Sequence, residues 1–163
     1  MSARVYVSLG SNLDREAKIR QAVAMLREHF DNIELSPVYD SAAVGFDGSN
    51  FLNLVAGFDT ELGVEDVALI FRDIEGRLGR DRTLPKFASR PIDLDILIYD
   101  DLVLDIRGIR IPRPEILHNA FVLKPLQDIA PDSLHPEKGE SYAALWQQMV
   151  VTAPRLDLVT LDL

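Results

Sequence analysis

The chain has 163 residues, of which 47% are hydrophobic and 26% are charged, and these values indicate a globular domain long enough to bury a core. Its formal net charge of −9 argues against a general nucleic-acid or membrane-surface binder, because such proteins present a broad basic face. The absence of cysteine excludes disulfides, thiolate zinc sites and cysteine nucleophiles. No apolar run approaches the roughly 18 residues of a membrane span, and the first residues lead into a predicted strand instead of a signal peptide, so we expect a cytoplasmic protein.

The N-terminal part of the chain predicts a strand followed by a helix. Residues 4–9 alternate and are rich in β-forming side chains, and we expect this strand to stop at Gly10. Either Ser11 or Asn12 would then be the N-cap of a helix whose apolar stripe lies within 19–30. Such a turn could hold an anion at the helix start, but a fold-supporting turn is the better interpretation, and we do not predict Gly10 to be catalytic.

Two more strands and a second helix follow. Residues 32–43 predict an edge or irregular strand because Pro37 interrupts them, and residues 51–62 predict a further strand. Residues 63–78 predict a helix with one apolar face, and Gly79 has the position of the residue that ends it.

The order of these elements through residue 97 is βαββαβ. That order is ferredoxin-like, an α+β fold in which helices pack on an antiparallel sheet. Beyond it we expect a short hairpin, two helical regions and a short last strand, over 102–111, 117–130, 141–151 and 156–161. The sequence therefore predicts a single domain over 1–163, with a ferredoxin-like core and an added C-terminal hairpin and helices.

The most specific chemistry lies at the start of a predicted strand after the second helix. Asp93 and Asp95 are two residues apart, so on a strand both carboxylates point to one face, about 7 Å apart. Two rigidly held anionic oxygen donors suit Mg²⁺, which prefers carboxylates, waters and substrate phosphates. Such a pair alone is more often a solvated edge or an arginine-paired structural feature. Here the apolar run through residue 99 places it, we expect, on a strand inside the sheet.

A basic cluster precedes these carboxylates in an otherwise acidic chain. Its members are Arg77, Arg80, Arg82, Lys86 and Arg90. Arginines beside two carboxylates are typical of a phosphate clamp around a metal ion. The loop that carries most of them, 80–89, has little apolar content, and we expect it to be exposed and to act as a lid.

Four blocks of the chain carry a resemblance to a known family. They are VSLGSNL at 7–13, FLN at 51–53, KFASRPIDLDIL at 86–97 and a series of short matches within 111–131. On these blocks nearly the whole chain resembles the 6-hydroxymethyl-7,8-dihydropterin pyrophosphokinases of folate biosynthesis. The resemblance implies transfer of the pyrophosphoryl group of ATP to the hydroxymethyl oxygen of the dihydropterin, with release of AMP. It also implies two Mg²⁺ ions, and we expect a monomer whose partners are these two small molecules, with no nucleic acid and no membrane.

The resemblance assigns roles to residues by position. Asp93 and Asp95 would bind the metal and, with Arg80 and Arg90, form the catalytic group. The residues implied to bind ATP are Glu75, Arg82, Lys86, Arg110 and Arg113. Those implied to bind the dihydropterin are Ser41, Ala42, Val44, Phe51, Asn53, Phe87 and Phe121.

The aromatic and amide positions have alternative interpretations. With the family, Phe51 and Phe121 would sandwich the pterin ring and Asn53 would bind its polar edge. Without it, the two phenylalanines would more often be core aromatics, and Asn53 would equally well be a structural hydrogen-bonding residue.

Several positions depart from the family pattern. Phe51 and Phe87 lie where members often have Tyr and Trp, and Ala88-Ser89 replaces the more usual Gly-Pro. Two further departures change the polar or charged side chain. Arg113 replaces a histidine found in many members, and Asn119 replaces a common arginine. Because the metal ligands and the Arg80–Arg90 pair remain, we predict an active enzyme, and the alternative is a pterin- or nucleotide-binding paralogue with weak or no transfer activity. A nucleic-acid module and a metal-dependent phosphatase are disfavoured by the net charge and by carboxylates lying inside an apolar strand.

Overall fold

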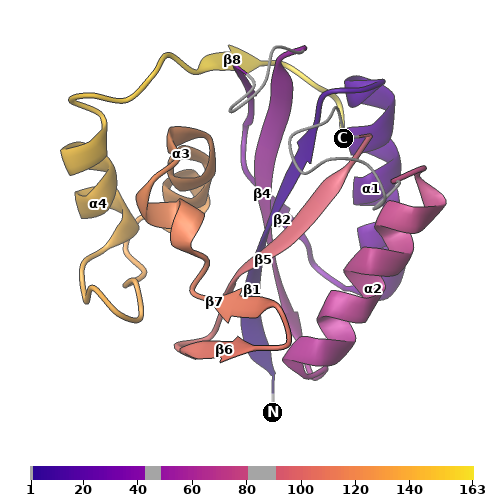
Figure 1. The fold of residues 1–163 in the computed structure, drawn as a ribbon, viewed down its shortest axis with the longest axis horizontal. Coiled ribbons are helices and arrows are strands. Elements are labelled where there is room, and N and C mark those ends of the chain that lie inside the picture. Colours follow the sequence, from indigo (N-terminus) through magenta and orange to yellow (C-terminus); the bar gives the residue numbers. More distant parts are fainter. Residues whose placement is uncertain (1, 43–48, 81–90) are drawn as a thin grey trace.

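The computed structural model describes residues 2–42, 49–80 and 91–163, and Figure 1 shows a sheet with helices on both faces. The strands of this sheet are β1 (Ala3–Ser11), β2 (Glu34–Leu35), β3 (Val38–Ser41), β4 (Phe51–Thr60), β5 (Asp93–Tyr99) and β8 (Asp157–Val159). A separate hairpin consists of β6 (Leu104–Ile106) and β7 (Ile109–Ile111). The helices are α1 (Arg15–His29), α2 (Val64–Arg77), the 3₁₀ turn Pro114–Leu117, α3 (Ala120–Ile129) and α4 (Tyr142–Met149).

The sheet confirms the predicted α+β, ferredoxin-like arrangement. Its order is β5-β1-β4-β3-β8, β2 also pairs with β4, and every pair is antiparallel. The predicted irregular strand is divided into β2 and β3 around Pro37, which has no N–H to donate to the ladder. The sequence pattern placed the first hairpin strand two residues too early, at 102–104 rather than 104–106.

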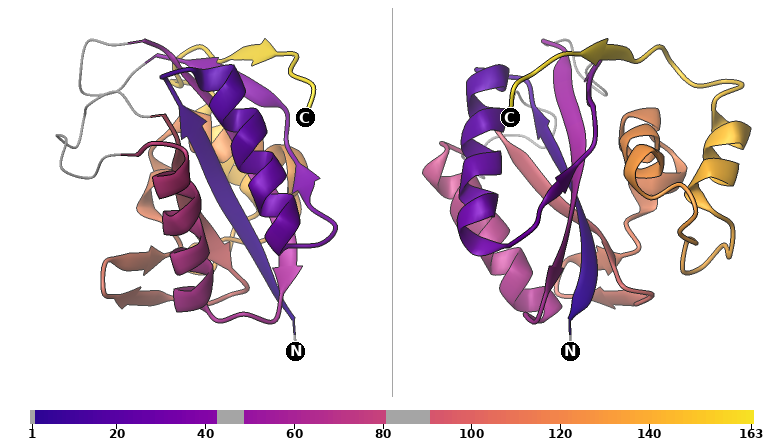
Figure 2. Two further views of the ribbon diagram at one scale, coloured as in Figure 1. Left: turned by 90° about the vertical axis from the view of Figure 1, so that its right-hand side faces the viewer. Right: turned by 180° about the vertical axis from the view of Figure 1, so that it is seen from behind.

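Helices cover the two faces of the sheet with separate cores, as Figure 2 shows from two sides. Because side chains alternate along a strand, Val5, Val7 and Leu9 of β1 pack toward α1 and α2, whereas Tyr6 points toward α3 and α4. In the described part of the chain, no helix is long and apolar enough to cross a lipid bilayer.

The prediction that the Asp93/Asp95 strand lies inside the sheet is wrong, since β5 is an edge strand. Its apolar run is nevertheless buried, because the side chains of Leu94 and Ile96 pack in one core and those of Leu97 and Ile98 in the other. Its outer edge is also partly covered: the backbone N–H of Arg113 donates to the carbonyl of Leu97 at 3.0 Å. An edge strand covered in this way has the same apolar sequence pattern as a central one.

The predicted N-cap is also wrong. β1 continues through Ser11, which pairs with Leu52 of β4, and α1 begins at Arg15 after Asp14, whose φ of 49° is left-handed. The two polar side chains are used elsewhere: the Ser11 hydroxyl donates to the carbonyl of Leu13, and the Asn12 amide donates to that of Ser49.

Gly79 ends α2 as predicted and turns the chain toward β5. Its φ is +95°, its N–H donates to the carbonyl of Gly76, and the N–H of Arg80 donates to the carbonyl of Glu75 at 2.9 Å. These two bonds form a Schellman motif, which needs a left-handed residue at this position. The turn therefore fixes where the Arg80 side chain leaves the helix.

We expect Gly79→Ala to lower the free energy of unfolding by about 1 kcal/mol, because alanine is strained at positive φ. Gly76→Ala is the matched control: this exposed helical glycine has open space at its Cβ position, so alanine should stabilise α2 by up to about 1 kcal/mol. Urea unfolding curves measure both changes. Equal effects of the two substitutions would contradict the assigned turn.

Candidate functional site

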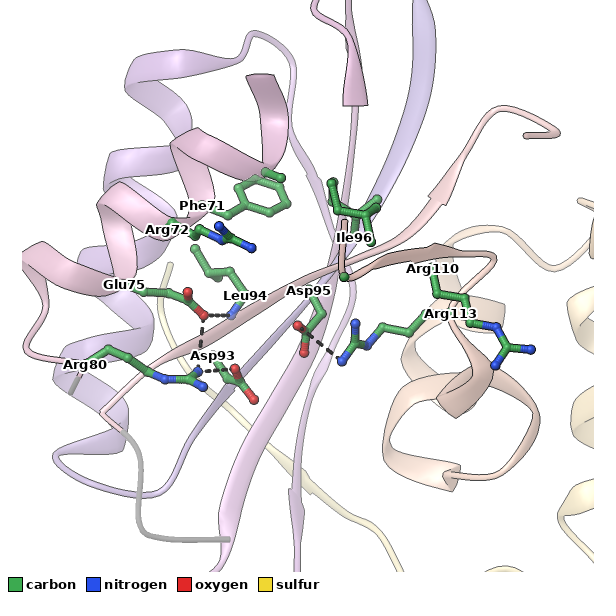
Figure 3. A pocket seen from close by; sticks show the side chains of 13 residues that line it. Phe71, Arg72, Glu75, Arg80, Asp93, Leu94, Asp95, Ile96, Arg110 and Arg113 are labelled. Carbon is green, nitrogen blue, oxygen red and sulfur yellow. Dashed lines mark hydrogen bonds and ion pairs between the residues drawn. The ribbon is translucent and has the colours of Figure 1, made fainter. Parts of the chain in front are cut away.

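A cavity of about 320 Å³ lies along the outer edge of β5. Its walls come from α2, from β5 and from the segment that begins in the β6–β7 hairpin and ends at Arg113 (Figure 3). It is lined by Ala68, Phe71, Arg72, Glu75, Arg80, Asp93, Leu94, Asp95, Ile96, Gly108, Ile109, Arg110 and Arg113. Four arginines and three carboxylates thus meet an apolar wall, a combination suited to a ligand with a flat apolar part and several negative charges.

The cavity reaches both sides of β5 because, among residues 2–42, 49–80 and 91–163, no strand pairs with its outer edge. Leu94 and Ile96 point to the α2 side, where Ala68 and Phe71 complete the apolar wall. Asp95 lies beside Ser8 of β1, which in turn lies beside Val55 on the face that α3 covers. The edge position therefore lets one ligand contact an apolar surface on one side and carboxylates on the other.

The Glu75 carboxylate is the most buried charge in the cavity wall, with 2% exposure. It accepts the backbone N–H of Leu94 at 2.9 Å and the Arg80 guanidinium at 3.3 Å. Arg80 also pairs with Asp93 (Figure 3). Burial lowers the pKa of Arg80, but the carboxylates of Asp93 and Glu75 more than offset this and leave that pKa above its ordinary value.

Asp95 is less well compensated than Asp93. Its nearest cation is Arg113, at 3.5 Å, and Arg113 is shared with Glu115. Burial, together with the neighbouring charge of Asp93, raises the pKa of Asp95 to about 7, although Arg113 acts in the opposite direction. Asp93 and Asp95 thus place two carboxylates close together, and a cation bound between them would reduce the repulsion that raises the pKa of Asp95.

The donor set fits Mg²⁺ bound together with a phosphate ligand. Within residues 2–42, 49–80 and 91–163, no group of three or more histidines, cysteines or acids is arranged to hold a metal. Mg²⁺ does not need such a cage, because it is commonly bound by one or two carboxylates, waters and substrate phosphates. Asp93 and Asp95 supply the carboxylates.

Several of the predicted dihydropterin-binding residues lie together at one end of β3 and β4. Ser41 pairs with Phe51, and the amide nitrogen of Asn53 donates to the Ser41 hydroxyl at 2.8 Å. Phe121 is on α3, which packs against both strands, and Ala42 is exposed just after β3. Asn53 thus makes the hydrogen bond expected of a structural residue, and its contact with the dihydropterin stays a prediction.

The remaining predicted residues divide into two groups. Arg110 and Arg113 line the cavity, Arg110 from the exposed face of β7. Five residues, Val44, Arg82, Lys86, Phe87 and Arg90, lie outside the described residues, as does nearly all of the predicted lid. Arg72 was not predicted but also lines the cavity. Its position three residues before Glu75 on α2 was a usable signal, because side chains at that spacing share a helix face.

Comparison with known proteins identifies a family. The model of 7,8-dihydro-6-hydroxymethylpterin-pyrophosphokinase (HPPK) matches residues 6–131. An Aquifex aeolicus protein named 2-amino-4-hydroxy-6-hydroxymethyldihydropteridine pyrophosphokinase is 37% identical over 136 residues, 82% of this chain and 84% of its own. A Pseudomonas aeruginosa protein of that name is 37% identical over 144 residues, 84% of this chain and 86% of its own. Folic acid synthesis protein fol1 of Pneumocystis carinii is 36% identical over 149 residues, 90% of this chain but 20% of its own.

A solved structure supports the fold. The wild-type Plasmodium falciparum HPPK-DHPS protein, crystallised with pteroate, superposes with a TM-score of 0.71 at 15% identity. The match covers 93% of this chain and 43% of that one. At this identity the likeness concerns the fold alone, and it agrees with the helix and strand arrangement described above.

The raised pKa of Asp95 predicts a pH-dependent effect on stability. The folded chain keeps this proton up to about pH 7, whereas the unfolded chain loses it near the ordinary pKa of 3.8. Ionisation therefore opposes folding, and the contribution of Asp95 to stability falls as the pH rises from about 4 to about 7. The difference in pKa corresponds to at most about 4 kcal/mol. Since the side chain is 29% exposed, we expect roughly half of that.

We accordingly expect Asp95→Asn to raise the free energy of unfolding by about 2 kcal/mol at about pH 8 and by little at about pH 4. Urea unfolding in the presence of a chelator measures this. The exposed Asp101, in the turn after β5, provides the control substitution Asp101→Asn. A gain that does not change with pH, or a loss at about pH 8, would contradict the assignment.

Proposed function

The chain belongs to the 7,8-dihydro-6-hydroxymethylpterin-pyrophosphokinase family, and we infer that it transfers the pyrophosphoryl group of ATP to the hydroxymethyl group of the dihydropterin, a step of folate biosynthesis. The hydroxymethyl oxygen loses its proton to solvent and forms a bond to the β-phosphorus, the bond between that phosphorus and the α,β-bridging oxygen breaks, and AMP leaves with the bridging oxygen. The observation that carries this inference is the family match over residues 6–131. The arginine- and carboxylate-lined cavity on β5 supports it, because phosphoryl transfer depends on positioning and charge neutralisation.

We propose that Asp93 and Asp95 bind Mg²⁺, with two ions expected. The raised pKa of Asp95 beside Asp93 supports this, since a cation there would offset the repulsion between the two carboxylates. Bound Mg²⁺ would neutralise phosphate charge and orient the phosphates for in-line displacement. The family resemblance implies a second role for Asp93, which is to orient the hydroxyl nucleophile.

The cavity arginines are proposed to hold the phosphates. Arg80 is fixed by Glu75 and Asp93, so its guanidinium is preorganised and little side-chain entropy is lost when a phosphate binds. Arg113 replaces the histidine of many family members, and its pairing with Asp95 keeps a cation beside the predicted metal site. Arg110 and Arg72 add positive charge at the exposed rim.

The apolar wall supports a site for the nucleotide base. Ala68, Phe71 and Ile96 offer a surface on which a flat ring can lie. The N–H of Leu94 points outward from β5, toward Glu75, and strand alternation directs the N–H of Ile96 outward as well. The N–H of Ile96 is therefore a backbone donor at the cavity wall, and a group of this kind fixes a base in one orientation.

Three predictions from the sequence remain part of this proposal. A single domain over 1–163 is supported by the sheet, because β8 near the C-terminus and β1 near the N-terminus belong to it. A monomeric state and a cytoplasmic location stay predictions. The transfer activity is also what separates the proposed enzyme from the alternative, a paralogue that binds pterin or nucleotide without transfer.

Product analysis tests the function directly. The protein is mixed with ATP, Mg²⁺ and 6-hydroxymethyl-7,8-dihydropterin, and the nucleotides are separated by chromatography. We expect AMP only when the dihydropterin and Mg²⁺ are both present. Asp93→Asn and Asp95→Asn should each lower the rate by about a hundredfold or more. The exposed Asp101→Asn should leave it unchanged.

Two results would contradict this assignment. Absence of AMP while the dihydropterin still binds would favour the non-catalytic paralogue. Full activity of Asp95→Asn would remove this residue from the metal site, and because that variant is expected to be more stable than wild type above pH 7, its loss of activity could not be attributed to unfolding.

Arg80→Lys tests the phosphate clamp. Lysine keeps the positive charge but not the planar fork that reaches two carboxylates and a phosphate at once, so we expect kcat to fall by about tenfold to a hundredfold. Arg77→Lys is the control, since Arg77 also carries a positive charge near the end of α2 but is 69% exposed and pairs with Asp73. Steady-state kinetics measure both. Equal rates for the two variants would exclude Arg80 from the clamp.

A further inference from the structure

Gly10 lies between the two predicted substrate sites. In β1 it pairs with Asn53 of β4 on one side and with Asp93 of β5 on the other. Residues directly opposite one another on neighbouring strands present their side chains on the same face. Asn53, Gly10 and Asp93 therefore form a row across three strands, and its ends are about 10 Å apart at the usual strand spacing.

The space above Gly10 is too small for a side chain. A Cβ atom there would lie 2.9 Å from the amide oxygen of Asn53 and 3.7 Å from the Phe51 ring. Asn53 has little freedom to move away, because it is 7% exposed and its amide nitrogen is bonded to Ser41. Gly10 has no positive φ, unlike Gly79, so the requirement is for space and not for an unusual backbone conformation.

The nitrogen of the Asn53 amide is hydrogen-bonded, whereas its oxygen lies beside the space above Gly10. Its nitrogen donates to Ser41, whereas no residue in the described ranges donates to its oxygen. In the described residues that oxygen is not among the fully buried polar atoms without a partner, so a hydrogen-bond donor from a ligand is compatible with its position. An N–H or amino group on the edge of a flat heterocycle is a suitable donor for it.

We propose that Gly10 is a positioning residue for the dihydropterin: it leaves the Asn53 amide and the Phe51 ring in place and forms the floor between them and Asp93. This inference rests on the proposed function and names a residue that determines where its pterin substrate lies. A flat ring held by Asn53 would extend over Gly10 toward the carboxylates of β5. A side chain at position 10 would displace the amide and block that path.

The test is Gly10→Ala, with dihydropterin binding measured by calorimetry in the presence of Mg²⁺ and a non-hydrolysable ATP analogue. We expect the Kd of the dihydropterin to rise by about tenfold or more, because a displacement of this size misaligns the amide. The Kd of the ATP analogue should not change. Gly57→Ala is the control: its Cβ would lie 2.7 Å from the Tyr6 ring, an even closer approach on the same sheet but away from the site, and we expect it to leave the Kd of the dihydropterin unchanged.

A double-mutant cycle separates positioning from a general loss of stability. In the background of Asn53→Ala the displaced atom is gone, so we expect Gly10→Ala to cause no further change in dihydropterin affinity. If Gly10→Ala is too destabilised for a binding measurement, the same cycle on the free energy of unfolding, measured at low temperature where the variant is folded, decides. Destabilisation that is equal with and without the Asn53 side chain would overturn the inference.

The outcomes for this inference and for the function are distinguishable. Unchanged dihydropterin affinity in Gly10→Ala, with normal binding and AMP formation by the wild type, overturns the role of Gly10 alone. A wild-type protein that neither binds the dihydropterin nor forms AMP overturns the proposed function, and the role of Gly10 with it.

Discussion

The buried carboxylate of Glu75 connects the segments that form the cavity wall. It accepts the first N–H on the outer edge of β5 and the guanidinium of Arg80, which follows the turn at Gly79. One charge thus joins the end of α2, the turn and the start of the strand that carries both candidate metal ligands. A carboxylate with 2% exposure is stable in the fold only while it is paired. The positions of these three segments therefore depend on one another.

The carboxylates at the site illustrate a conflict between stability and chemistry. Asp93 pairs with Arg80, whereas Asp95 pairs with Arg113, which it shares with Glu115, and the pKa of Asp95 is raised by burial and by the charge of Asp93. A fold selected for stability alone would have an amide there. Two neighbouring carboxylates on a rigid strand would be stabilised by a bound cation, which is the physical basis for proposing Mg²⁺.

The local features of this structure could be predicted from the sequence and the non-local ones could not. The helix and strand order, the end of α2 at Gly79 and the shared face of Asp93 and Asp95 all follow from periodicity or turn chemistry within a few residues. The edge position of β5 could not be predicted, because α2 and the segment at Arg113 bury it as fully as a central strand. The N-cap prediction failed for a similar reason, since Asn12 bonds to a carbonyl 37 residues away.

The proposed role of Gly10 follows from its neighbours in the sheet and could not be inferred from the sequence. In the sequence it is a glycine at the end of a strand, for which a turn is the ordinary explanation. In the sheet it is the only position between Asn53 on β4 and Asp93 on β5, so its missing side chain has a consequence on both sides. If ATP occupies the cavity at the outer edge of β5 and the dihydropterin is held at Asn53, the two substrates can meet only across β1. β1 must then carry no side chain at this position, and glycine is the residue that has none.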